Sequence, residues 1–196
     1  MLASASPRRR ELLQAAGVEF SVLPVDVDED LAAFESPEQA ALELAVRKAR
    51  AGAAAWSARR ESGAACIVGA DTVVAAPRGN AWSLLGKPVD ARDAERMLAL
   101  LSGTRHLVVT GVAVVRTSDA AERSSVERTF VTMREIARAE RERYVESGEW
   151  RGKAGGYAIQ ETADRFVVGL EEGGFDNVVG LPVALALRLL DELCPR

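Results

Sequence analysis

The 196-residue sequence has few of the residues that build metal centres or disulfide frameworks, with two cysteines and a single histidine. Cys66 and Cys194 lie far apart at no spacing that metal ligands use, and His106 alone excludes a multi-histidine metal centre. We therefore expect two free thiols, which are typical of a reducing compartment. The composition favours a cytoplasmic protein over a secreted, disulfide-stabilised one.

The sequence also lacks an excess of positive charge and any long hydrophobic run. Its 25 Lys and Arg face 29 Asp and Glu, which leaves a net charge of -4, whereas non-specific nucleic-acid binding needs a broad basic surface. No apolar stretch approaches the roughly 20 residues that cross a bilayer. Residues 1–7 have neither the cationic start nor the apolar run of a secretory signal. We expect no nucleic-acid partner and no membrane segment.

The sequence contains enough apolar material for one folded domain, since hydrophobic residues make up 48% of it. Helical and strand-like segments alternate without a linker, an internal repeat or a low-complexity tract, so residues 1–196 are predicted to form a single domain. A hairpin over residues 73–85 and an adjacent strand pair over 106–115 and 126–133 interrupt a purely parallel pattern. The predicted fold class is α/β with a mixed sheet.

Capping signals and hydrophobic periodicity place the helices. Ser6-Pro7 and Ser36-Pro37 each combine an N-cap residue with a first-turn proline, and Asp90 can cap a third helix. Further helices are expected over residues 139–147 and 181–190, and short strands over residues 20–25 and 166–168.

The segment Ser4-Ala5-Ser6-Pro7-Arg8-Arg9-Arg10 places three arginines in the first turn of a predicted helix. That end of a helix is already positive because of its peptide dipoles, so the arrangement is unfavourable unless an anion binds there. Free backbone N–H groups, two serine hydroxyls and guanidinium groups together form a cradle for a polyphosphate. The alternative is a solvated basic turn, and the segment lacks the glycines of a Walker-type phosphate loop.

Carboxylates are concentrated at two places. Asp71 follows the apolar run 66–70, where a rigidly held carboxylate can bind a divalent metal or accept a proton from water. The alternative for Asp71 is a turn or capping residue. The run Asp26-Val27-Asp28-Glu29-Asp30 offers four carboxylates as oxygen ligands for Mg²⁺, or it is a solvated acidic loop.

Two lysines and one amide complete the candidate residues. Lys87, fixed between a glycine and a proline, and Lys48, beside the apolar stripe of its helix, either bind phosphate or are ordinary surface charges. The run Lys153–Gln160 contains paired glycines that permit close approach to a ligand, or it is only a strand-entry loop. Gln160 offers both a donor and an acceptor to the edge of a base. Cations, carboxylates and an amide together favour hydrolysis of a nucleotide polyphosphate over acyl transfer or redox chemistry.

These segments resemble the motifs of the Maf family, nucleoside triphosphate pyrophosphatases associated with septum formation. The resemblance runs from Leu2 to about Leu190. Its motifs are Leu2-Ala3-Ser4-Ala5-Ser6-Pro7-Arg8-Arg9, Gly69-Ala70-Asp71-Thr72, Lys87-Pro88, Leu101-Ser102-Gly103 with His106 and Thr110, Lys153-Ala154-Gly155-Gly156-Tyr157-Ala158-Ile159-Gln160, and Val179-Gly180-Leu181-Pro182.

The resemblance implies an elongated mixed sheet flanked by helices, with two lobes around a central cleft, similar to the inosine triphosphate pyrophosphatases. It also implies a homodimer, and hydrolysis of a nucleoside triphosphate to the monophosphate and pyrophosphate with Mg²⁺ or Mn²⁺. The resemblance implies that Asp71 acts as the general base and that Lys87 is a second catalytic residue. It implies that the triphosphate is bound by Ser4, Arg9, Lys48 and Lys87. The metal would be bound by Asp28 or Glu29, together with Asp71.

The family has two substrate branches, one for dTTP and UTP and one for 7-methyl-GTP. Arg8, Thr72 and Gln160 match the first branch, which favours pyrimidine triphosphates, including modified ones, and a role in removing nucleotides that would be misincorporated. The alternatives are a 7-methyl-GTP pyrophosphatase and a non-catalytic nucleotide-sensing regulator of cell division. Glu161 stands where the family usually has glycine, and it adds a negative charge near the expected base pocket.

Overall fold

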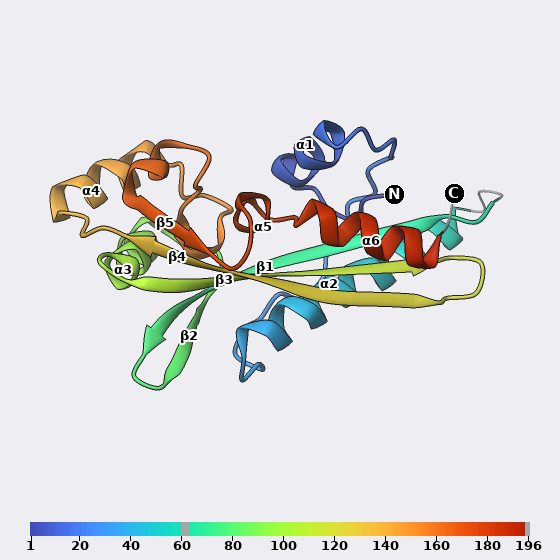
Figure 1. Ribbon diagram of the computed structural model, residues 1–196, viewed down its shortest axis with the longest axis horizontal. Coiled ribbons are helices and arrows are strands. Elements are labelled where there is room, and N and C mark those ends of the chain that lie inside the picture. The colour runs from blue at the N-terminus through green and yellow to red at the C-terminus, as the bar shows by residue number, and fades with distance from the viewer. Residues whose placement is uncertain (60–62, 195–196) are drawn as a thin grey trace.

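The computed structural model describes residues 1–59 and 63–194. It contains an elongated five-stranded sheet in the order β2-β1-β3-β4-β5 (Figure 1). The strands are β1 (Cys66–Arg78), β2 (Ala81–Leu85), β3 (Arg105–Arg116), β4 (Glu122–Met133) and β5 (Val167–Glu171). The helices are α1 (Pro7–Ala15), α2 (Pro37–Ala58), α3 (Ala91–Leu101), α4 (Arg138–Ser147), α5 (Phe175–Val179) and α6 (Val183–Leu193).

The predicted α/β class and the sheet flanked by helices are confirmed. All four neighbouring pairs among these five strands are antiparallel. Parallel pairing within the described residues is confined to Leu2, which bridges both Val22 and Val68. The mixed character of the sheet therefore comes from the N-terminal segment, which runs beside the start of β1.

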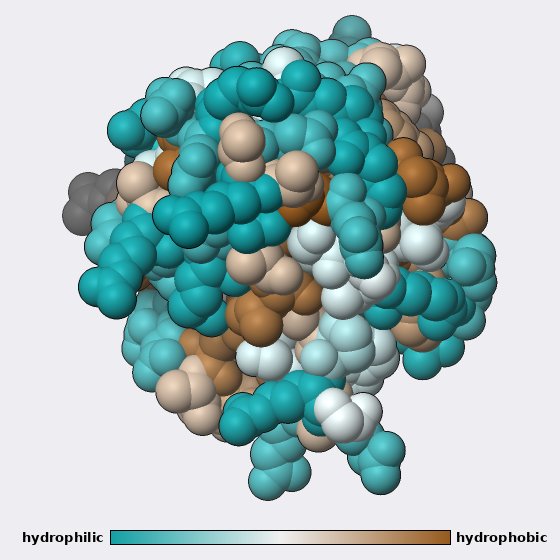
Figure 2. Space-filling view, turned by 90° about the vertical axis from the view of Figure 1, so that its left-hand side faces the viewer, coloured by the Kyte–Doolittle hydropathy of each residue, from teal (hydrophilic) through white to brown (hydrophobic). Residues whose placement is uncertain are grey.

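Helices cover the two faces of the sheet unequally. Helix α2 lies along one face, whereas α1, α5 and α6 lie on the other (Figure 1). Helices α3 and α4 pack with Tyr144 and Phe166 into a separate core at one end, while α6 packs with Leu2 and Val112 into another. The end that carries α4 has a mostly hydrophilic surface, in which small apolar areas are separated by polar side chains (Figure 2).

Two glycines allow α2 to approach the sheet closely. A Cβ atom at Gly69 of β1 would collide with the carbonyl of Ala45, and one at Gly111 of β3 would collide with the carbonyl of Ala41. The facing side of α2 is accordingly lined with alanines that are fully buried. Lys48 lies about one helical turn after Ala45, and this contact brings it over the middle of β1.

The predicted helix starts are confirmed, because Ser6, Ser36 and Asp90 each accept a hydrogen bond from the backbone N–H three residues later. The strand expected over residues 20–25 is wrong. Only Val22 forms a bridge, and Pro24 has no N–H group with which to extend the ladder. The expected strand 166–168 lies at Val167–Glu171, and the C-terminal helix begins at Val183, after Pro182 at its N-cap.

The prediction of two free thiols is also wrong, because the structure joins Cys66 and Cys194 in a disulfide. Cys66 begins β1, and Cys194 follows the end of α6. The packing of α6 on the sheet brings these ends together across 128 residues of sequence. At such a separation the spacing of the two cysteines does not predict that they pair. In the part of the chain that the structure describes, no helix is both long and apolar enough to span a membrane.

Candidate functional site

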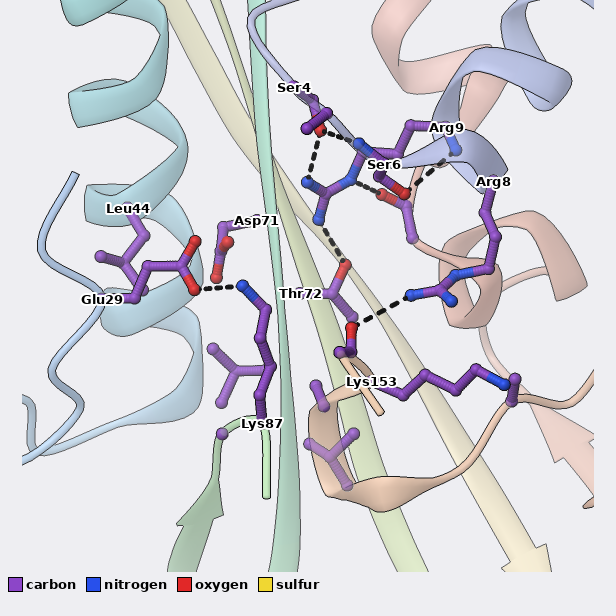
Figure 3. A pocket seen from close by; sticks show the side chains of 18 of the residues that line it. Ser4, Ser6, Arg8, Arg9, Glu29, Leu44, Asp71, Thr72, Lys87 and Lys153 are labelled. Atoms are coloured by element: carbon purple, nitrogen blue, oxygen red, sulfur yellow. Dashed lines mark hydrogen bonds and ion pairs between the residues drawn. The ribbon is translucent and has the colours of Figure 1, made fainter. Parts of the chain in front are cut away.

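A cleft of about 980 Å³ opens between the two ends of the molecule. One wall consists of residues 3–9 with the start of α1, and the opposite wall consists of the loop 151–160 and residues 86–89. Strand β1 forms the floor, with Asp71 and Thr72 at its centre (Figure 3). The two lobes around a central cleft that the resemblance implied are therefore present.

Carboxylates and lysines pair along the side of the cleft formed by α2 and β1. The ammonium group of Lys48, which is buried, donates to Asp71 and also to Oε1 of Glu29 at 2.6 Å. The other carboxylate oxygen of Glu29 accepts from Lys87, which reaches in from the loop after β2 (Figure 3). Asp71, Lys48, Glu29 and Lys87 thus form one chain of alternating charge.

Glu29 is held as a carboxylate by its two lysine partners. Burial alone would raise the pKa of Glu29, but hydrogen bonds from Lys48 and Lys87 outweigh it and lower the pKa to about 2. Glu29 is consequently ionised throughout the neutral range, as a ligand for a cation must be.

Arg9 is held differently, on the wall formed by the N-terminal segment. Its Nε donates to the Gly180 carbonyl at 2.7 Å, and its two terminal nitrogens donate to Ser4 Oγ at 3.2 Å and to Thr72 Oγ1 at 3.3 Å. These three partners are uncharged. Desolvation lowers the pKa of the buried guanidinium from its ordinary value, although the nearby Asp71 charge partly opposes this. A guanidinium has five N–H donors, so two remain for an anion in the cleft.

Gly180 is a site residue to which the sequence assigned no role. Its φ of 127° is a backbone conformation that favours glycine, and a Cβ there would lie 3.4 Å from Thr72 Oγ1 and 3.6 Å from Arg9 Nε. The glycine therefore lets its carbonyl turn towards Arg9. Only its place in the motif Val179-Gly180-Leu181-Pro182 marked it in the sequence.

The wall opposite residues 3–9 includes the loop that contains the paired glycines. Arg8 reaches across the cleft and donates to the Gly152 carbonyl at 3.5 Å (Figure 3). Lys153 is buried and pairs with Glu161, so the charge that Glu161 adds is balanced within the loop. The side chain of Gln160 is exposed and lines the cleft.

His106, on β3, contacts this loop through Tyr157. Its Nε2 lies 2.8 Å from the hydroxyl of Tyr157, and burial lowers the pKa of His106 to about 3. Burial also raises the pKa of Tyr157. Both groups are therefore neutral at ordinary pH, and they join the loop to β3 without a charge.

The structure brings together nearly all the candidate residues from the sequence. Those that line the cleft are Ser4, Arg8, Arg9, Glu29, Lys48, Asp71, Thr72, Lys87 and Gln160. Asp28 is the exception, because its side chain is absent from the lining and accepts a hydrogen bond from the backbone N–H of Asp30. The resemblance implied either Asp28 or Glu29 as a metal ligand, and of these two the geometry favours Glu29.

The carboxylates that face the cleft suit a metal bound partly by substrate. Among the described residues no group of three or more His, Cys, Asp and Glu side chains could enclose an ion. Glu29 and Asp71 nevertheless converge on one point, the ammonium group of Lys48. Mg²⁺ commonly uses one or two carboxylates, with phosphate oxygens and water completing its coordination. The residues present fit such an ion.

The fold and the cleft together define an α/β protein equipped to bind a polyphosphate, with cations on two sides of the cleft and carboxylates paired with the lysines of one side. The sequence belongs to the Maf family, since the family described as Maf-like protein matches residues 1–193. The resemblance drawn from the motifs is thereby confirmed.

Related proteins align over nearly the whole chain. A protein of Alkalilimnicola ehrlichii named dTTP/UTP pyrophosphatase is 47% identical over 97% of this chain and 91% of its own length. Proteins of the same name from Mesorhizobium japonicum and Hahella chejuensis are 42% and 43% identical, over 97% and 98% of this chain and 89% and 90% of their own lengths.

Proposed function

We propose that this protein hydrolyses dTTP and UTP, and modified pyrimidine triphosphates, to the nucleoside monophosphate and pyrophosphate. The observation that carries the proposal is the buried Asp71 carboxylate, held by Lys48 on the floor of a cleft whose wall at residues 3–9 holds Arg9. The names of the relatives supply the substrate.

The triphosphate binds between the two cationic walls. Arg9 contributes the two N–H donors that its neutral partners leave over, and Ser4 lies beside it. Lys48 and Lys87 approach from the other side, where each exchanges a carboxylate partner for a phosphate oxygen. Charge-assisted hydrogen bonds of this kind are about twice as strong as neutral ones.

Asp71 accepts the proton of the water that attacks the α-phosphorus. The ammonium group of Lys48 orients the Asp71 carboxylate, and Lys87 stabilises the negative charge that develops on the phosphoryl oxygens. Glu29 and Asp71 would hold Mg²⁺ or Mn²⁺, which neutralises phosphate charge when bound. Arg8, Thr72 and Gln160, which also line the cleft, contact the nucleoside.

The test is pyrophosphate release from dTTP, UTP, CTP, GTP and 7-methyl-GTP, with Mg²⁺, with Mn²⁺ and with EDTA. We expect metal-dependent release from dTTP and UTP. Release from 7-methyl-GTP alone would support the proposed hydrolysis to pyrophosphate but refute the pyrimidine specificity. Tight binding of nucleotide without any release would refute the enzyme and favour the nucleotide-sensing regulator.

A cytoplasmic location and a homodimer belong to the same proposal. Free nucleotide substrates favour the cytoplasm, but the Cys66–Cys194 disulfide opposes it, because disulfides are rare in that compartment. Alkylation of free thiols in freshly lysed cells, followed by mass spectrometry, decides the redox state of the pair. Light scattering of the purified protein tests the dimer.

A further inference from the structure

Behind Thr72 a chain of hydrogen bonds leads away from the cleft into the core. Thr72 on β1 and Thr110 on β3 are directly paired in the sheet, and their hydroxyl oxygens lie 2.9 Å apart. The Thr110 hydroxyl also lies 2.8 Å from the backbone carbonyl of Asn177 in α5. Thr110 and Asn177 are fully buried, and neither lines the cleft.

The two ends of this chain determine the direction of every hydrogen bond in it. The Asn177 carbonyl can only accept, so the single proton of the Thr110 hydroxyl points to it. Thr110 Oγ1 must then accept, and the proton that it accepts is the one on Thr72. At the other end the Arg9 guanidinium can only donate, and Thr72 Oγ1 accepts from it at 3.3 Å.

The direction of the chain leaves Thr72 with one role towards a ligand. Its only hydroxyl proton is committed to Thr110, and one of its lone pairs is taken by Arg9. The remaining lone pair can accept a hydrogen bond but cannot donate one. Uracil and thymine carry a donor at N3, whereas cytosine carries an acceptor there.

We propose that Thr110 is a positioning residue for base selection, which holds the Thr72 proton away from the cleft so that Thr72 accepts from the N3–H of uracil or thymine and repels the N3 lone pair of cytosine. This inference rests on the proposed function. It adds a physical reason for the choice among pyrimidines, located in a residue that touches no substrate.

The test compares kcat/KM for UTP and CTP in the Thr110→Val variant, which removes the hydroxyl at nearly constant shape. The freed Thr72 proton can then turn to the cytosine N3. We expect the UTP to CTP ratio to fall ~10-fold, as for one mismatched hydrogen bond, mainly through a lower KM for CTP. General damage to the site would not improve CTP. An unchanged ratio, or equal losses for both substrates, would overturn the relay.

Three further variants separate the relay from ordinary packing. Thr110→Ser retains the hydroxyl and should restore the wild-type ratio. Thr72→Val combined with Thr110→Val should give the ratio of Thr72→Val alone, because Thr110 acts through Thr72. The matched control is Thr129→Val, which removes another fully buried hydroxyl bonded to Asn177, at its side-chain nitrogen, and should leave the ratio unchanged. A control that shifts the ratio as much as Thr110→Val would overturn the proposal.

A modified substrate separates the base from the ribose as the group that Thr72 meets. N3-methyl-UTP keeps the ribose hydroxyls but lacks the N3–H donor. Wild-type protein should use it poorly, and Thr110→Val should not change that preference. If N3-methyl-UTP is hydrolysed as well as UTP, the contact with N3 is refuted. If the wild type releases no pyrophosphate from UTP, the proposed function itself fails, whereas release with an unchanged UTP to CTP ratio in Thr110→Val refutes the relay alone.

Discussion

On the side of the cleft formed by α2 and β1, lysine ammonium groups face carboxylates, whereas on the side formed by residues 4–9 the Arg9 guanidinium faces only neutral oxygen atoms. The first arrangement balances its charge within the protein. The second leaves a buried cation whose direct hydrogen-bond partners are all uncharged. The two sides therefore differ in what an arriving anion can gain from them.

The difference matters because desolvating an unpaired charge is expensive. Lys48 and Lys87 must each exchange a carboxylate for a phosphate oxygen, so part of their attraction for substrate is already used within the protein. Arg9 gives up no charged partner, and its neutral partners hold the guanidinium in a fixed orientation. We infer that the lysine side governs the chemistry and the arginine side governs affinity.

The largest effect is expected at the charge-paired side, from Asp71→Asn. The amide keeps the size of the carboxylate but cannot act as a base, so kcat for dTTP should fall at least ~10²-fold while nucleotide binding persists. Pyrophosphate release and calorimetry measure the two quantities. Asp191→Asn on the exposed side of α6 is the control, and an unchanged kcat would show that Asp71 is not the base.

The opposite side is tested by Arg9→Lys, which keeps the positive charge but loses the planar set of donors. A lysine has only three N–H donors, so those that meet the Gly180, Ser4 and Thr72 oxygens are not available to a phosphate. We therefore expect KM for dTTP to rise ~50-fold with a smaller change in kcat. The adjacent Arg10, which is exposed, provides the matched control Arg10→Lys. A fall in kcat at constant KM would reverse the division of roles between the two sides.

His106 is a buried group that is neutral, and its expected effect is on the stability of the protein rather than on substrate binding. Its pKa is about 3 in the folded protein and 6.5 ordinarily, so the unfolded chain binds the extra proton between these values. The stability is fully present above pH 6.5 and is lost as the pH falls. From pH 7.5 to 5 the free energy of unfolding should drop by about 2 kcal/mol through this group.

His106→Phe should remove that part of the pH dependence, which urea unfolding at pH 7.5 and pH 5 measures. The single histidine of the chain makes the comparison clean. Equal pH dependence in both proteins would mean that His106 is protonated while folded.

The smallest effect is expected from Glu29→Gln, which removes one carboxylate of the candidate metal site and leaves Asp71. The Mg²⁺ concentration for half-maximal activity should rise ~10-fold, the usual scale for weakening a metal site. Asp28→Asn is the control and should behave as wild type, because Asp28 bonds the loop backbone away from the cleft. A larger effect at Asp28 than at Glu29 would reverse this assignment.

Several parts of the site could be predicted because they depend on neighbouring residues. Ser6, Pro7 and the three arginines specify a capped helix start with excess positive charge, and the structure has it. The short strand expected over residues 20–25 failed because strand formation needs a partner along its whole length. Leu2 supplies a partner at Val22 alone.

The sequence by itself determined where the capped helices α1, α2 and α3 begin, which residue types are available for chemistry, and that the acidic loop has several carboxylates. Only the tertiary structure decided that Glu29 rather than Asp28 faces the cleft, that Arg9 meets the carbonyl 171 residues away, and that the two cysteines are joined. The physical reason is how far apart in the sequence the contacting residues lie. A cap is a contact between residues three apart, whereas these contacts depend on sheet register and on the close approach of helices to the sheet.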